Sequence, residues 1–137
     1  MVSDELILKI SRAIAQEEGF NVANSVPQRA HNPGDLTDDG DVGLGTVQTS
    51  GPHGAKITIY ATDADGWAAL YRKVRRMLSG ASHTYTPELS LIQVGLKWAG
   101  DPNWGRNVAD VLGIDPQMTL AEIASEDMKR QDGAQEA

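Results

Sequence analysis

A long polar stretch, residues 19–55, constrains the fold of this chain more than any other feature. It is rich in Gly, Asn, Asp and Pro and shows no sustained hydrophobic period. Connections longer than about 15 residues without secondary structure of their own are uncommon inside compact domains, and they are usually functional. We therefore expect residues 19–55 to form a functional loop, either wholly irregular or with a small β-hairpin in it.

Helical patterns flank this stretch on both sides. Residues 4–18 predict a first helix, with Ser3 as its N-terminal cap and Gly19 as its left-handed end. The alternating segment "KITIYAT", residues 56–62, predicts one short, half-buried strand. Four more helices are predicted from caps and periodicity: residues 63–78 after Thr62, Pro87 to near Gly100, the segment "DPNW" to Gly113, and a last one from Thr119, which forms a capping box with Glu122.

The length and composition favour one globular unit. The chain has 137 residues, of which 40% are apolar and 23% are charged, enough for one core of ordinary size and too few for two. We expect a single domain over residues 1–128 and a frayed polar tail over residues 129–137. The predicted fold class is mainly α, a helical domain with a long polar loop or a small β-hairpin after its first helix.

The charge and hydropathy exclude some classes of partner. A net charge of −7 argues against a nucleic-acid-binding protein, because phosphates are bound by lysine and arginine. No run of about 18 or more apolar residues is present, so no membrane span is expected. The acidic, amphipathic N-terminus is unlike a signal peptide. We expect a monomer, and the sequence leaves its compartment open.

An aspartate-rich segment imitates a calcium-binding loop. Asp35, Thr37, Asp39 and Gly40 follow the first half of such a loop, but Thr46 stands at position twelve, where calcium needs a bidentate glutamate. A solvated acidic turn is the simpler interpretation. The three histidines lie in separate loop-like segments without metal-ligand spacing, and the chain has no cysteine. We therefore expect no metal ion and no cofactor.

The segment "AQEEGF", at the end of the first predicted helix, holds the best candidates for acid–base chemistry. A glutamate in the last helical turn sits at the negative end of the helix dipole, which disfavours its ionised form and raises its pKa, as a general acid requires. Helical periodicity places both Glu17 and Glu18 near the apolar face and does not choose between them. The alternative is that both are exposed residues at a frayed helix end.

Several segments together resemble a known family. They are "EEGF", "VPQRAHNPGDL", "YATDADGWAALYRKV", "YTPELSLIQVGLKWAG" and "NVADVLGI", and they are similar to segments of lysozyme-like peptidoglycan lytic transglycosylases of bacteria and phages. The resemblance implies a lysozyme-like fold with Glu18, not Glu17, as the catalytic glutamate, and it matches Asn32 to a loop asparagine of the family. The sequence departs from that pattern at Asp35, where asparagine is frequent, and at "AH", residues 30–31, where asparagines are common.

This resemblance implies a defined reaction. Glu18 would protonate the β-1,4 bond between N-acetylmuramic acid and N-acetylglucosamine and then, as a carboxylate, help the muramic C6 hydroxyl close onto C1 to give a 1,6-anhydro product. The partner would be peptidoglycan glycan strands, met at the cell wall, in the periplasm, or by a phage-derived protein. The residues expected to bind the substrate are Gln28, Asn32, Asp35, Tyr60 and Tyr85. The two tyrosines would serve as sugar platforms or hydroxyl donors, and a packing role is the alternative for both.

Other functions stay open at this point. A lysozyme-type hydrolase would use Asp35 as a second carboxylate. A non-catalytic module that binds the cell wall or serves in a virion would keep the fold without turnover, although the glutamate at position 18 argues against a decayed site. An unrelated helical partner-binding domain is the third alternative.

Overall fold

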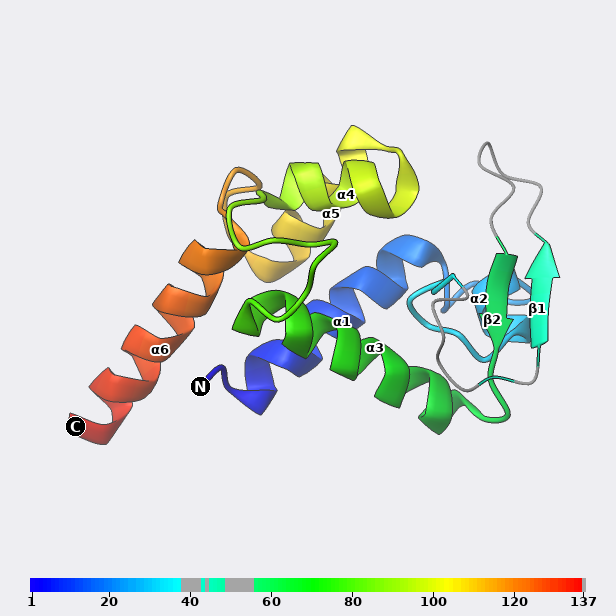
Figure 1. Ribbon diagram of the computed structural model, residues 1–137, viewed down its shortest axis with the longest axis horizontal. Helices are drawn as coiled ribbons and strands as arrows, with labels where there is room; N and C mark the ends of the chain where they lie inside the picture. Colours follow the sequence, from blue (N-terminus) through cyan, green and yellow to red (C-terminus); the bar gives the residue numbers. More distant parts are fainter. Residues whose placement is uncertain (38–42, 44, 49–55, 137) are drawn as a thin grey trace. The chain divides into compact units, whose positions relative to one another are not determined.

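The computed structural model describes residues 1–37, 43, 45–48 and 56–136 (Figure 1). Within these residues the chain is mainly helical, as predicted, and the lysozyme-like fold stays a prediction. The elements follow in the order α1 (Asp4–Glu18), α2 (Val26–Arg29), β1 (Gly45–Gln48), β2 (Lys56–Ile59), α3 (Asp63–Ser79), α4 (Leu91–Ala99), α5 (Pro102–Leu112) and α6 (Leu120–Glu136).

The chain divides into two compact units. Unit 1 comprises Met1–Ala13 and Lys73–Ala137, and unit 2 comprises Ile14–Arg72. The helices α1 and α3 therefore each contribute to both units.

Local capping chemistry sets several helix ends where the sequence predicts them. The Ser3 hydroxyl accepts the N–H of Leu6 at 3.2 Å at the start of α1, and the Thr62 hydroxyl accepts the N–H of Asp65 at 3.2 Å at the start of α3. At α6 the reciprocal bonds between Thr119 and Glu122 form the predicted capping box. These ends depend on neighbouring residues alone, which is why sequence suffices to place them.

Two predicted helix boundaries are wrong. The helix expected from Pro87 begins at Leu91, because Ser90 and Gln93 cap each other's backbone reciprocally while the preceding residues form a turn closed by the bond from Leu89 N–H to the Thr86 carbonyl at 3.1 Å. The frayed tail expected after residue 128 is helical and extends α6 to Glu136. Its Lys, Arg, Gln, Ala and Glu residues are good helix formers, which outweigh the one glycine among them.

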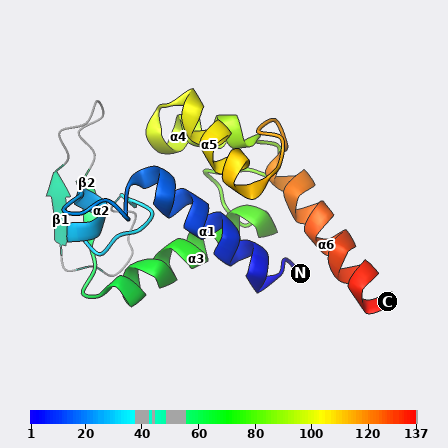
Figure 2. The same ribbon diagram turned by 180° about the vertical axis from the view of Figure 1, so that it is seen from behind.

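Close backbone packing joins α4 and α5 in unit 1, where they lie side by side in Figures 1 and 2. A Cβ on Gly105 would lie 2.4 Å from the Leu91 carbonyl oxygen, and one on Gly95 would lie 2.9 Å from the backbone nitrogen of Gly105. Around this contact the side chains of Val94 and Val108 are fully buried. The two glycines thus allow the two helix backbones to pack closely around the buried valines of this unit.

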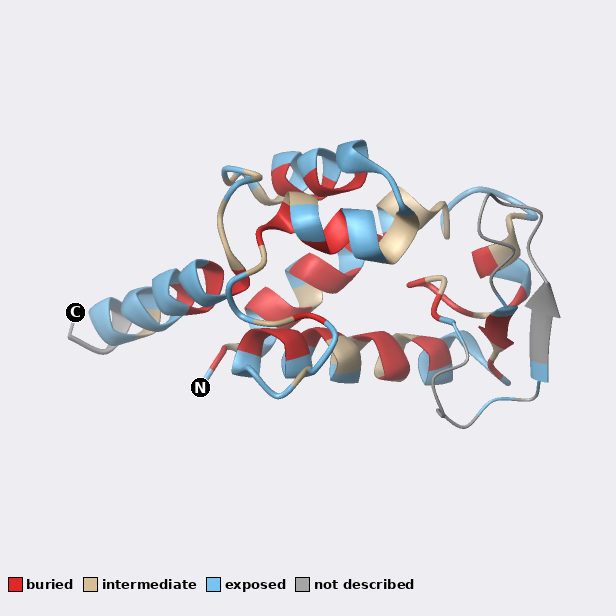
Figure 3. Cartoon of the chain, turned by 45° about the horizontal axis from the view of Figure 1, so that its top comes forward, coloured by how far each residue is buried: buried red, intermediate tan, exposed pale blue. Residues whose placement is uncertain are grey.

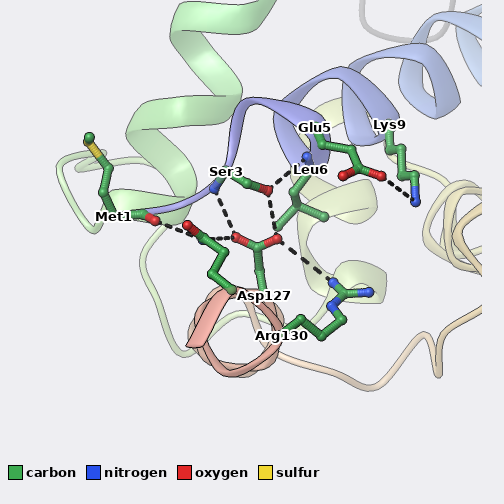
Figure 4. A network of polar contacts seen from close by, with 8 residues as sticks. Met1, Ser3, Glu5, Leu6, Lys9, Asp127 and Arg130 are labelled. Carbon is green, nitrogen blue, oxygen red and sulfur yellow. Dashed lines mark hydrogen bonds and ion pairs between the residues drawn. The ribbon is translucent and has the colours of Figure 1, made fainter. Parts of the chain in front are cut away.

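A buried aspartate of α6 caps the start of α1 in unit 1 (Figure 4). Asp127 is 5% exposed, and its two carboxylate oxygens accept the Ser3 N–H at 2.8 Å and the Ser3 hydroxyl at 2.7 Å. The Gln131 amide donates to Asp127 at 2.9 Å, and an Arg130 guanidinium nitrogen lies 3.9 Å away. Burial alone would raise the pKa of Asp127, but these hydrogen bonds and the arginine charge outweigh it, so that the pKa is lowered. Elsewhere α6 exposes most of its residues (Figure 3).

We expect Asp127→Ala to lower the free energy of unfolding by about 1–2 kcal/mol at neutral pH, because it removes a charged cap from α1. A lowered pKa stabilises the fold above the unfolded value, and this stabilisation is lost as the pH falls through the folded value. The difference between parent and variant should therefore shrink below about pH 4. Denaturant titrations over pH 2–7 measure it, with Asp132→Ala, an exposed change on the same helix, as the control. An equal loss in both variants would contradict the capping role.

Unit 2 contains the two strands and the short helix α2. The strands pair antiparallel, with Gly45 opposite Ile59 and Gln48 opposite Lys56, as the arrows labelled in Figure 1 show. The strand β2 is also bonded to the segment that follows α2, since the Thr58 N–H donates to the Leu36 carbonyl at 3.0 Å. The hydrophobic periodicity of the sequence does not predict α2. Its signals are a cap at Ser25, whose hydroxyl accepts the Gln28 N–H, and a proline in the first turn.

Candidate functional site

Unit 2 holds the catalytic candidate and most of the residues predicted to bind substrate. Glu18 ends α1, Gln28 lies on α2, and Tyr60 follows β2. Asn32 and Asp35 lie between α2 and the strands. Tyr85 is the exception, since it belongs to unit 1.

The end of α1 fixes Glu18 in place. The helix stops because Gly19 adopts a left-handed conformation, φ +83°, and the N–H groups of Gly19 and Phe20 donate to the carbonyls of Gln16 and Ala15 at 3.2 and 3.0 Å. This is a Schellman end, for which glycine is the preferred residue. Glu18 is partly exposed, and the last turn of α1 contains no basic residue. A carboxyl group is therefore held at the negative end of a helix without a basic side chain in that turn to offset the helix dipole.

Aromatic packing holds the turn that follows Glu18. The Phe20 ring meets the Trp67 ring edge-on, with centroids 5.5 Å apart and an interplanar angle of 81°. Trp67 in turn stacks on Tyr71 at 5.8 Å. The residue after the glutamate–glycine pair is thus anchored on α3, which restricts the motion of the segment next to Glu18.

Ser25 connects this turn to α2. Its hydroxyl donates to the Gly19 carbonyl at 2.7 Å and accepts the N–H of Gln28 at 3.3 Å. The Gln28 side-chain oxygen accepts the N–H of Asn24 at 2.8 Å, and Asn24 has a left-handed φ of +64°. Gln28 is exposed, so it can meet a ligand while it also stabilises this turn.

Asn32 organises the loop from the inside. Its side chain is 0% exposed, and its amide donates to the carbonyls of Leu36 and Thr58, both at 2.9 Å, while its oxygen accepts the Leu36 N–H at 2.9 Å. Both amide hydrogens are used, so the side chain cannot donate to a ligand in this structure. The predicted direct contact of Asn32 with substrate is therefore not available, and its role is to tie the loop to β2.

Asp35 occupies a constrained position in the same loop. It adopts a left-handed φ of +51°, a region that aspartate tolerates better than most residues, and its N–H donates to the Asn32 carbonyl at 3.0 Å. Within the described part of the chain, its Oδ1 is buried without a hydrogen-bond partner. Burial raises the pKa of Asp35 to about 6. Its carboxyl group is consequently neutral in mildly acidic solution and ionised above about pH 6.

The first turn of α3 supports the other side of this loop. His31 Nδ1 lies 2.7 Å from Asp63 Oδ1, and a Cβ on Gly66 would lie only 1.9 Å from the His31 carbonyl oxygen and 2.8 Å from Pro33 Cδ. Only glycine at position 66 permits this approach of the loop to the helix. The loop from Ala30 to Leu36 is thus held by β2 on one side and by α3 on the other.

The two tyrosines predicted as sugar platforms are buried. Tyr60 is 2% and Tyr85 6% exposed. Tyr85 packs 5.5 Å from the Trp98 ring, and the Lys73 ammonium lies 5.3 Å from the Tyr85 ring centroid and 5.1 Å from that of Trp98. A sugar stacks on an exposed ring face, which neither tyrosine offers here, so packing is the role that the structure gives them.

The remaining expectations concern metal ions and membranes. Within the described ranges, no group of three His, Asp or Glu side chains could hold a metal ion. Asp39 and Gly40 of the calcium-like segment lie outside the described residues. No helix in the described part of the chain is long and apolar enough to cross a membrane.

Two hollows in unit 1 lie away from these residues. One of about 400 Å³ lies beside Leu6, Ile114 and Met118, and another of about 230 Å³ lies beside Asp127, both in unit 1. In unit 2, a smaller hollow of about 110 Å³ is lined by Val26, Arg29, Ala30 and Ile59. It adjoins α2, which carries Gln28.

Comparison with protein-family models, with curated proteins and with solved structures finds no match for this chain.

Proposed function

We propose that this protein is a lytic transglycosylase that cleaves the β-1,4 bond between N-acetylmuramic acid and N-acetylglucosamine in peptidoglycan, with Glu18 as general acid and then general base. The observation that carries the proposal is the position of Glu18. It closes α1 as a partly exposed carboxyl and is followed by a turn that hydrogen bonds and aromatic packing hold in place. An acid catalyst needs this combination of solvent access and fixed geometry.

One carboxyl group suffices for this reaction. Glu18 donates its proton to the glycosidic oxygen as the C1–O bond breaks, which leaves an oxocarbenium-like centre at C1. The Glu18 carboxylate then accepts the proton of the muramic C6 hydroxyl as that oxygen bonds to C1. The products are a 1,6-anhydro sugar and a free hydroxyl on the leaving sugar, and Glu18 is protonated again, so that no water is consumed.

The loop after α2 would supply contacts to the glycan. Gln28 and Asp35 are the residues predicted to bind substrate that the structure leaves exposed or partly exposed. Asn32, Ser25 and the His31–Asp63 pair act through the loop as positioning residues, since their polar groups bond within unit 2. Tyr60 and Tyr85, which are buried, have no part in the proposed contact surface.

A lysozyme-type hydrolase is the second candidate, and the buried carboxyl of Asp35 is the observation that favours it. Hydrolysis requires a carboxylate that activates water or stabilises the cationic centre. With its pKa raised to about 6, Asp35 could serve in this way only above that pH. Hydrolytic products should then increase as the pH rises through 6, whereas a transglycosylase gives anhydro products throughout.

Digestion of purified peptidoglycan, followed by mass spectrometry of the released muropeptides, tests the proposal. Anhydro-muramic ends are expected from the parent protein. Reducing muramic ends would instead establish the hydrolase. If neither product forms while Glu18→Gln and parent bind peptidoglycan equally, the protein is a non-catalytic wall-binding module and the enzymatic proposal is wrong.

A further inference from the structure

The carboxyl group of Asp35 is in an unusual situation for a surface loop. Its Oδ1 is buried and lacks a hydrogen-bond partner among the described residues, while the residue as a whole is partly exposed. Oδ2 is not among the buried side-chain atoms that lack a partner, and it is the carboxyl oxygen that we assign to a ligand. An ionised carboxylate with one oxygen buried and unpaired is strongly disfavoured, because charge needs solvation or hydrogen bonds. Burying a neutral carboxyl group costs less free energy, since only an uncharged carbonyl oxygen is left without a hydrogen bond.

The loop prevents Asp35 from relaxing out of this position. Its backbone has a left-handed φ, its N–H is bonded to the Asn32 carbonyl, and Asn32 is itself bonded to Leu36 and Thr58. The preceding residue, Gly34, packs so closely that a Cβ would lie 2.7 Å from Leu70 Cδ1. Both sides of Asp35 are thus fixed within unit 2.

No charged group within the described residues explains this state of Asp35. Burial is the cause of its raised pKa, about 6. The other charged side chains on the described elements of unit 2 are Glu17 and Glu18 of α1, Arg29 of α2, His31 of the loop, Lys56 of β2, and Asp63, Asp65 and Arg72 of α3.

We propose that Asp35 binds the glycan as a neutral carboxylic acid, with its Oδ2 hydroxyl donating a hydrogen bond to an acceptor oxygen of the sugar. This inference rests on the proposed function. Sugar hydroxyls and N-acetyl carbonyls are suitable acceptors, and neither needs a charged partner. Ionisation removes the donor and places a negative charge against those oxygens, so glycan binding weakens as Asp35 loses its proton.

Binding measurements in the Glu18→Gln background test this proposal, because that substitution slows cleavage strongly and removes the carboxyl group at position 18. The probe is soluble peptidoglycan glycan freed of its stem peptides, measured by calorimetry from pH 4.5 to 8. Affinity is expected to fall by up to about tenfold for each pH unit above about 6.

Two further variants, made in the same Glu18→Gln background, identify the group responsible. Adding Asp35→Asn, whose amide donates at every pH, should keep the low-pH affinity across the range. Adding Asp35→Ala should give an affinity that is lower than that of Asp35→Asn at every pH, and lower than that of the Glu18→Gln parent only below about pH 6, where Asp35 is protonated.

The outcomes separate this inference from the proposed function. If the glycan binds but the pH dependence of its affinity is the same with and without Asp35→Asn, the neutral-acid role is wrong while the proposed function stands. If no glycan binds at any pH, the proposed function fails, and the inference about binding fails with it. Denaturant unfolding then tests the protonated state separately: unfolding free energy should decrease between pH 4 and 7 in the parent relative to Asp35→Asn, since a raised pKa stabilises the fold below the unfolded value.

Discussion

Replacing Glu18 by glutamine should lower the rate of glycan cleavage by about 10³-fold or more, because a positioned general acid contributes about 10²–10⁴-fold and here the same group also serves as the base. Glutamine has nearly the same size and can still donate a hydrogen bond, but it cannot transfer a proton to the glycosidic oxygen. Glu18 is partly exposed at the end of α1, so the fold should tolerate the change. Initial rates of muropeptide release, with the melting temperature as a check on folding, give the measurement.

Glu17→Gln is the matched control for this substitution. It makes the same chemical change at the neighbouring position, at the same helix end and with the same loss of charge. Its cleavage rate should stay within a few-fold of the parent rate, because Glu17 has no role in the proposed reaction. Equal losses in the two variants would show that charge at the helix end, rather than a specific acid, matters. A larger loss in Glu17→Gln would show that Glu17, not Glu18, is the catalytic glutamate.

The sequence predicts those features of the fold that depend on neighbouring residues. The starts of α1 and α3 each follow from one capping hydroxyl, that of Ser3 and that of Thr62. The C-terminal end of α1 follows from Gly19. The sequence places the start of α4 wrongly because two hydroxyl residues could cap it. Thr86 precedes a proline, yet its hydroxyl donates to the Glu88 carboxylate. The Ser90 hydroxyl instead accepts a backbone N–H of the helix, that of Gln93. The sequence alone does not reveal which of the two hydroxyls bonds to a backbone N–H.

Those parts of the candidate site that depend on neighbouring residues are likewise predictable from the sequence. The helical pattern ends at Glu18, and the structure ends α1 at the same residue. Asn32 and Tyr60 are expected from the sequence to meet substrate, but tertiary contacts bury both. Such burial depends on how the loop folds onto β2, which no local pattern records. Ser25, in contrast, carries a recognisable signal, a cap with proline in the first helical turn.

Gly66 is the clearest case of a residue whose importance appears only in three dimensions. Its sequence context is an ordinary helix start, where alanine would increase helix stability by about 1 kcal/mol. We expect Gly66→Ala instead to lower the free energy of unfolding by about 3 kcal/mol, the upper end of the usual cost of overpacking, because its Cβ would lie 1.9 Å from the His31 carbonyl oxygen and backbone cannot move aside as a flexible side chain can. A fall in melting temperature of roughly 10 °C follows for a chain of this size.

Gly133→Ala is the matched control, since a Cβ at that exposed position of α6 meets no atom within 4 Å. This control should be as stable as the parent or slightly more stable. Gly66→Ala should also reduce glycan cleavage more than its loss of stability explains, because the displaced loop carries Asp35. Measuring both variants below their melting temperatures separates the two effects. If Gly66→Ala matches the control in stability and in cleavage rate, then α3 does not support the loop, and the positioning role assigned to His31 and its neighbours is wrong.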